Sequence, residues 1–165
     1  MDITFWGIRG SIAVSGPDFA RFGGNTTCIE VAHDGERLIL DAGTGLRALG
    51  EKLLAEARVL GRRIATTFLF SHLHWDHIQG FPFFGPAFRP DVELELFGPC
   101  DDDGVGLREA LARQMQPPSF PVPLSAMASH KTFHTLTSGD VLARRGFEVR
   151  SEEHTSELQS PLNIS

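Results

Sequence analysis

The chain has 165 residues, 41% of them hydrophobic and 22% charged, which is an ordinary composition for one globular domain. Its formal net charge of −6 disfavours a generally basic surface, so we expect no DNA partner. Two cysteines, Cys28 and Cys100, make no disulfide framework, and the N-terminus lacks a signal-peptide pattern. No apolar run approaches the roughly 20 residues that span a bilayer. We expect a cytoplasmic protein without membrane contact.

The first part of the chain predicts strands joined by turns. Residues 3–8 and 27–33 have strand-like patterns, and Asp34-Gly35 is a strong hairpin signal before a return strand at 37–40. From Thr44 onward the apolar residues recur at helical spacing, which predicts a helix. The apolar face of this helix is predicted to contain Leu46, Leu49, Leu53, Ala57 and Leu60. Gly61 supplies a stop for this helix.

The second part of the chain continues the interleaving of strands and helices. A continuous apolar run at 64–70 predicts a strand buried on both faces. Residues 92–97 predict a further strand and 105–115 a helix, and a proline-rich connector leads to strand-like pieces at 131–136 and 141–149. The expected class is α/β or mixed α+β.

The stretch "FLFSHLHWDHIQGFPFF", residues 68–84, carries three histidines and an aspartate within six residues at the end of the buried strand. Side chains at i and i+2 of extended backbone project to one side, so His72 and His74 can converge on one ion. Asp76 and His77 follow a short bend and can face a second ion. Imidazole nitrogen and carboxylate oxygen suit zinc, and also manganese or iron. The pattern predicts a metal site.

"SHLHWDH" resembles the H-x-H-x-D-H signature of the metallo-β-lactamase superfamily. The resemblance extends to "GIRGS", "GGNTTC", "ILDAGTGLRALG" and "IQGFPFFGPAF", and is strongest to the phosphodiesterase branch, which includes tRNase Z-like enzymes that process tRNA 3′ ends. It implies an αββα sandwich of which residues 1–149 are the N-terminal half.

The resemblance also implies a dinuclear site, with His72 and His74 on one divalent ion, Asp76 and His77 on the other, and zinc as the expected metal. A water or hydroxide between the ions would be the nucleophile, with Asp76 orienting it as the catalytic residue. Asp41, in "LDAGTG", resembles the family's carboxylate that holds a ligand histidine in its tautomer; the alternative is an aspartate of a strand-end turn. Phe81, Phe83 and Phe84 fit either a pocket wall or the core.

Four donors on one segment do not complete two metal sites. The remaining histidines are His33, which we expect to be exposed at a hairpin, His130 and His134, which lack site-like neighbours, and His154. In the superfamily, the other ligands come from the C-terminal half of the fold.

Residues 150–165, "RSEEHTSELQSPLNIS", are polar, lack any period and begin with one reading frame of a sequencing adapter. We therefore expect a non-native tail that includes His154, and a natural gene that continues past Val149. Re-reading the locus from intact genomic DNA tests this hypothesis. We further expect one sheet face to lack its covering layer, and metal binding and catalysis by this chain to be weak.

The function that follows is metal-assisted hydrolysis of a phosphodiester, either a small or cyclic molecule or an RNA end. Two alternatives stay open: a thioester or lactam-type hydrolase on the same fold, and a non-catalytic metal-binding regulatory domain. A homodimer is compatible with the sequence. Beyond the metals, no residue predicts an organic cofactor.

Overall fold

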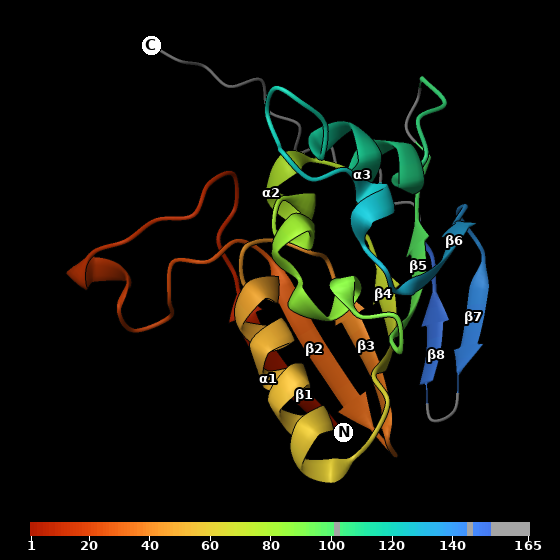
Figure 1. Ribbon diagram of the computed structural model, residues 1–165, viewed down its shortest axis with the longest axis horizontal. Coiled ribbons are helices and arrows are strands. Elements are labelled where there is room, and N and C mark those ends of the chain that lie inside the picture. The colour runs from red at the N-terminus through yellow and green to blue at the C-terminus, as the bar shows by residue number, and fades with distance from the viewer. Residues whose placement is uncertain (101–102, 145–146, 153–165) are drawn as a thin grey trace.

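The computed structural model describes residues 1–100, 103–144 and 147–152 (Figure 1). Six strands form one sheet in chain order: β1 (Asp2–Gly7), β2 (Cys28–His33), β3 (Glu36–Leu40), β4 (Ala65–Leu69), β5 (Glu93–Gly98) and β6 (His130–Thr135). The strands β1 to β3 pair antiparallel, whereas β3 to β6 run parallel. The predicted mixed class is confirmed.

The helices and 3₁₀ turns join these strands. They are η1 (Pro17–Phe19), α1 (Leu46–Leu60), α2 (Trp75–Ile78), η2 (Phe81–Phe83), η3 (Gly85–Phe88), α3 (Leu107–Gln114) and η4 (Leu124–Ala126). In Figure 1, α1 lies in front of β1 and alongside β2. None of the helices in the described part of the chain combines the length and apolar character that crossing a bilayer requires.

The helix α1 ends as its sequence predicts, because Gly61 adopts a left-handed conformation at φ 62°. Its buried side chains include Leu46, Leu49 and Leu53. The expectation that Leu60 continues this face is wrong, since Leu60 is 59% exposed. Helical periodicity therefore identified the correct side of α1 but overestimated how far the buried stripe extends.

The main core lies between the helices and one face of the sheet. Phe68 at its centre is fully buried, and the rings of Phe81 and Phe84 pack against it edge to face at centroid distances of 6.0 and 5.4 Å. Phe81 and Phe84 are therefore core residues, whereas Phe83 is 57% exposed. Cys28 is also fully buried in this core. Residues Thr66 to Leu69 of β4 are all buried, which confirms the prediction of a strand covered on both faces.

A separate hairpin covers part of the second face of the sheet. The segment 141–149, predicted as one strand-like piece, is in fact two strands, β7 (Val141–Arg144) and β8 (Phe147–Arg150), paired antiparallel. Leu142, Phe147 and Val149 of this hairpin pack against a second cluster formed by three buried side chains, Leu38, Leu69 and Phe97. The expectation of an uncovered face is therefore corrected for β3 to β5, but it holds for β1, where Ile3 and Phe5 are 56% and 64% exposed.

Candidate metal centre

The predicted site residues lie at the carboxyl ends of two neighbouring parallel strands. Asp41 directly follows β3, and Ser71 and His72 follow β4, which pairs with β3. After His74 the chain turns into the single-turn helix α2, which begins at Trp75 and contains Asp76 and His77. Because parallel strands end at the same edge of a sheet, residues 36 positions apart in the sequence meet there.

Asp41 is the organising residue of this edge. Its backbone has a left-handed φ of 59°, unusual for a residue with a side chain, and its N–H donates to the carbonyl of Leu69 at 2.9 Å. Its carboxylate is 7% exposed and accepts a hydrogen bond from the Ser71 N–H at 2.8 Å and from the Ser71 hydroxyl at 2.9 Å. Its Oδ2 also lies 2.8 Å from Nδ1 of His77. This contact is the one that the resemblance predicts for a carboxylate behind a ligand histidine.

The Asp41 carboxylate fixes the orientation and the protonation of His77. The hydrogen bond to Asp41 raises the pKa of His77 above its ordinary value, burial opposes this, and the charges of Asp41 and Asp76 add to it. With Nδ1 donating to Asp41, Nε2 is the nitrogen left for another partner, and it lies 3.4 Å from Oδ2 of Asp76.

The three histidine rings of the motif cluster together. The ring centroid of His72 lies 4.5 Å from that of His74 and 3.9 Å from that of His77. Burial lowers the pKa of His72, and repulsion from His77 and His74 lowers it further, outweighing the attraction of Asp41 and Asp76. His72 and His77 therefore differ in protonation behaviour, and neutral His72 has one ring-nitrogen lone pair with which to bind a cation.

Asp76 is 9% exposed and is held by a distant segment. Its Oδ2 accepts a hydrogen bond from the backbone N–H of Ser11 at 2.7 Å, and Ser11 itself has a left-handed φ of 67°. Within the described residues, Oδ1 of Asp76 accepts no hydrogen bond, so this oxygen is free to act. Neither Ser11 nor Ser71 was identified from the sequence, because no local pattern reveals contacts across 65 positions, as from Ser11 to Asp76, or 30 positions, as from Ser71 to Asp41.

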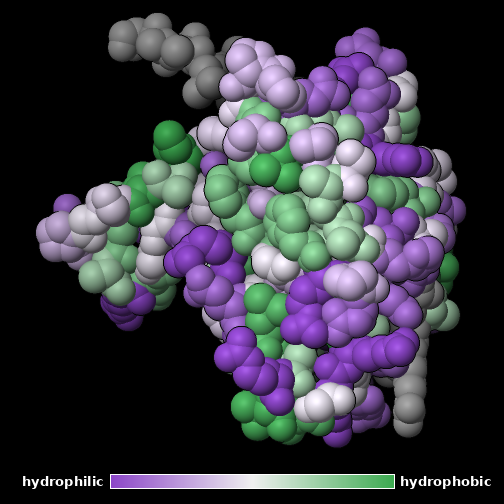
Figure 2. Space-filling view, viewed as in Figure 1, coloured by the Kyte–Doolittle hydropathy of each residue, from purple (hydrophilic) through white to green (hydrophobic). Residues whose placement is uncertain are grey.

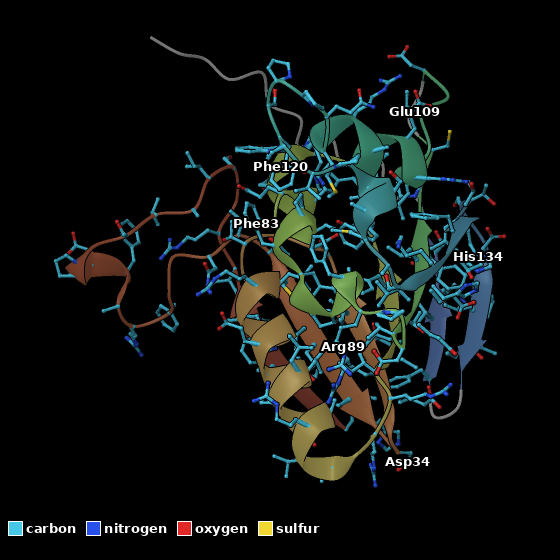
Figure 3. All side chains as sticks on the ribbon, in the orientation of Figure 1. Asp34, Phe83, Arg89, Glu109, Phe120 and His134 are labelled. Carbon is cyan, nitrogen blue, oxygen red and sulfur yellow. The ribbon has the colours of Figure 1, made fainter. Side chains whose placement is uncertain are left out.

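A cleft of about 830 Å³ opens beside these residues, between the sheet edge and the β7–β8 hairpin. Its lining combines polar residues of the sheet edge with apolar residues of both sides and polar residues around the hairpin: Asp41, Ser71, His72 and His74; Leu40, Leu69, Leu136, Leu142 and Val149; and Asp140, Arg150 and Glu152. The exposed ring of Phe83 lies outside this cleft and packs edge to face with Phe120 at 5.7 Å (Figure 3). Phe83 is therefore not a wall of the cleft.

The donors fit a divalent metal by their chemistry, since they combine three imidazoles with one carboxylate. As they are placed, however, no three histidine, cysteine, aspartate or glutamate side chains of the described chain are arranged to hold an ion. The structure thus gathers His72, His74, Asp76 and His77 at one edge without completing a ligand set among residues 1–100, 103–144 and 147–152.

The other histidines lie away from this edge of the sheet or outside the residues that the structure describes. His33 is half-buried, with its ring against Phe147, so the expectation that it is exposed is wrong. His134 stacks on Phe97 at 4.4 Å and lies 3.2 Å from a carboxylate oxygen of Glu95. His130 is exposed at the start of β6. His154 and most of the predicted tail fall among residues 153–165, outside the described residues; Arg150 itself is the last residue of β8.

Comparison with known proteins adds a family match to this geometry. Residues 21–98 match the family model described as the metallo-beta-lactamase superfamily. A comparison with curated protein sequences finds no match.

Solved structures share the fold at low sequence identity. The short form of human tRNase Z is 23% identical, with 84% of this chain and 47% of that chain covered and a TM-score of 0.50. A diphosphatase of the PhnP family is 14% identical, with 88% and 54% covered and a TM-score of 0.52. The metallo-beta-lactamase fold protein YhfI from Bacillus subtilis is 16% identical, with 90% and 50% covered and a TM-score of 0.53. The chain spans about half the length of each of these proteins, and at these identities the likeness concerns the fold alone.

Proposed function

We propose that this chain, whose residues 21–98 match the model of the metallo-beta-lactamase superfamily, belongs to that superfamily and carries part of the active site of a metal-dependent hydrolase that cleaves phosphodiesters. The proposed metals are two divalent ions, zinc foremost, with His72 and His74 contributing to one site and Asp76 and His77 to the other. The substrate is proposed to be a small or cyclic phosphodiester or an RNA end, and the protein to act in the cytoplasm. The observation that supports this most is the Asp41–His77 hydrogen bond beside the histidine cluster and the cleft.

In the proposed hydrolysis, Asp41, His77 and Asp76 have separate roles. Asp41 would accept a hydrogen bond from the Nδ1–H of His77 and so leave Nε2 as the nitrogen that binds the ion. The Ser11 N–H holds one oxygen of Asp76, and the other oxygen is placed to accept a hydrogen bond from an attacking water and to orient it. A divalent ion, when bound, supplies a lowered pKa for water and stabilises developing charge on the phosphoryl oxygens.

The ligand set is proposed to be completed by residues outside the described chain. Structural relatives that extend about twice as far offer a place for them. We therefore expect this chain to bind zinc weakly and to hydrolyse a phosphodiester at a negligible rate, whereas a longer protein that supplies the remaining ligands should be active.

Zinc binding is the direct test. Titration against a chromophoric zinc indicator should give an affinity that falls by about tenfold or more in His72→Ala, and Asp41→Asn should lower it about 10- to 100-fold, as loss of a ligand's supporting carboxylate does elsewhere. His130→Ala, an exposed histidine outside the site, is the matched control and should leave affinity unchanged. Affinity should rise with pH, because binding displaces the proton that His77 retains. Equal affinities for all four proteins would refute the site, and robust turnover by this chain would refute the incomplete ligand set.

A further inference from the structure

The strand β6 ends the six-stranded sheet. In Figure 1 the strands follow one another from β1 on the left to β6 on the right, and no strand of the described chain pairs with the outer side of β6. The N–H groups of His130 and Leu136 donate to carbonyls of β5 and of the residue before it, at 2.9 and 2.8 Å. Because the backbone groups of a strand alternate in direction, those of Lys131, Phe133 and Thr135 point away from the sheet. This edge of β6 can therefore pair with another extended chain.

A groove of about 480 Å³ lies beside this edge, between β6 on one side and α3 and η4 on the other. Its lining includes Leu124 and the half-buried Phe133, which packs against the main core. Figure 2 shows hydrophilic and apolar side chains side by side at the upper right of the molecule, where α3 and β6 lie. Among the described residues, no aspartate or glutamate lines the groove, although the net charge of the chain is −6. The groove is therefore a local exception on an acidic molecule.

Arg108 gives the groove a cation that no carboxylate neutralises. This residue is exposed on the first turn of α3, and its guanidinium carbon lies 6.0 Å from the ring centroid of Phe133. It forms no ion pair within the part of the chain that the structure describes, whereas Arg113 on the same helix pairs with Glu109. A guanidinium beside an aromatic ring at the rim of a groove is suited to binding the carboxylate of a partner.

Lys131 adds a second positive charge without blocking the edge. A lysine in an edge strand commonly discourages pairing with another chain. Here its Nζ donates to the carbonyls of Met127 and Ser129 at 2.5 and 2.8 Å and to the Ser129 hydroxyl at 3.2 Å. The side chain is thus tied to the segment that leads into β6. Because these acceptors are uncharged, the positive charge of Lys131 remains available to attract an anionic partner.

From this placement we propose that an acidic, extended segment of another protein adds to β6 as a seventh strand of the sheet and places a carboxylate on Arg108. Its backbone would pair with the outward N–H and C=O groups of β6. Alternate side chains of an added strand point to one face of the sheet, so every second residue would enter the groove. The groove favours a carboxylate near Arg108 and an apolar side chain near Phe133.

The charges of β6 argue against a second copy of the chain as this partner. The strand His130–Thr135 contains two histidines and a lysine and no carboxylate, so two copies joined at β6 would bring like charges together. The groove also shares no lining residue with the cleft at the candidate metal centre. The inference therefore does not rest on the proposed hydrolysis.

The test uses a fluorescein-labelled decapeptide in which threonine alternates with valine and glutamate, and measures its binding by anisotropy. Arg108→Gln should weaken binding about tenfold, at the low end for a hydrogen bond between charged groups because Arg108 stays partly solvated. A peptide with lysine in place of glutamate should bind at least tenfold more weakly. Arg108→Glu should reverse this preference and favour the lysine peptide. Arg58→Gln, which removes the same charge from an exposed residue in the last turn of α1, is the matched control and should leave binding unchanged.

Two further measurements test the addition of a strand. Amide hydrogen exchange at Lys131, Phe133 and Thr135 should slow when the glutamate peptide binds, and exchange in β1, at the other end of the sheet, should not change. Methylation of the backbone nitrogens in one alternate set of peptide residues should abolish binding. Methylation of the other set should have little effect, because only one set faces β6.

Four outcomes would overturn the inference: no binding of the glutamate peptide, an equal loss in Arg58→Gln, slower exchange in β1 but not in β6, or equal effects of the two methylated peptides. Self-association of the chain that slows exchange at β6 would also overturn it, because the partner would then be a second copy. None of these readouts involves zinc, so they leave the proposed hydrolase to be judged by the zinc titration alone.

Discussion

Asp41 and His77 lie 36 residues apart in the sequence and are joined by a 2.8 Å hydrogen bond between Oδ2 and Nδ1. The contact exists because the chain leaves β3 and β4 at the same edge of the sheet, with Asp41 in a left-handed conformation that returns its N–H to the Leu69 carbonyl. It defines which nitrogen of His77 is free, and hence what this edge of the sheet can bind.

The protonation of this pair gives a prediction for Asp41→Asn. The pKa of His77 is raised in the folded protein. The stability that this histidine contributes is therefore complete below its unfolded-state pKa of about 6.5, and it is lost as pH rises through its folded-state pKa. His72 has a lowered pKa and acts in the opposite sense, with its contribution lost as pH falls through about 6.5. In metal-free protein, NMR titration of the rings should place the midpoint of His77 above that of His72, and Asp41→Asn should lower the His77 midpoint. An unchanged midpoint would show that Asp41 does not govern His77.

A second prediction concerns Glu30, a carboxylate that is 2% exposed beneath α1. It accepts hydrogen bonds from Trp6 Nε1 at 3.1 Å and from Lys52 Nζ at 3.0 Å, and Arg37 Nε lies 2.8 Å away in an ion pair without hydrogen-bond alignment. Glu30→Gln removes the charge between two cations and should lower the free energy of unfolding by about 3 kcal/mol, at the low end for a broken buried pair because Lys52 stays partly solvated. Urea unfolding measures this effect. Glu51→Gln breaks the exposed pair with Arg47 and should change it by less than about 0.5 kcal/mol.

A third prediction concerns Gly80, the residue that packs α2 against the loop after β3. A Cβ at this position would lie 1.9 Å from the carbonyl oxygen of Gly43, and backbone on both sides leaves no flexible atom to yield. Gly80→Ala should therefore destabilise the fold by about 3 kcal/mol and disturb the position of His77. Gly10→Ala, where an added Cβ meets nothing within 4 Å, should be close to neutral. Thermal unfolding of the two variants makes the comparison, and equal melting temperatures would contradict the close approach.

A fourth prediction concerns the part of the second sheet face, at β1, that the β7–β8 hairpin does not cover. Phe5 faces the same side as the half-buried Ile29, its partner in the β1–β2 register. Because this apolar surface lies at an edge strand, it should bind a hydrophobic dye and promote association. Phe5→Thr should reduce dye fluorescence and light scattering while changing the free energy of unfolding by less than about 0.5 kcal/mol. Loss of stability instead would mean that Phe5 belongs to the packed core.

Several features of the fold could be predicted from short-range sequence patterns. The Asp34-Gly35 hairpin, the stop of α1 at Gly61 and the buried strand β4 are all local features, in which turn conformation or the period of apolar residues decides the outcome. The same patterns did not reveal that 141–149 folds back on itself, or that Leu60 lies beyond the covered part of α1. Those depend on what packs against each segment.

By itself, the sequence determined that three histidines and an aspartate stand together after a buried strand, because donors within six residues stay neighbours in any fold. Only the tertiary structure decided what surrounds them. Asp41 reaches His77 across the sheet edge, Ser11 reaches Asp76 from the segment between β1 and β2, and the β7–β8 hairpin lines the cleft opposite the sheet edge. The physical reason is that hydrogen bonds between residues tens of positions apart depend on strand order and strand direction, which no local period records.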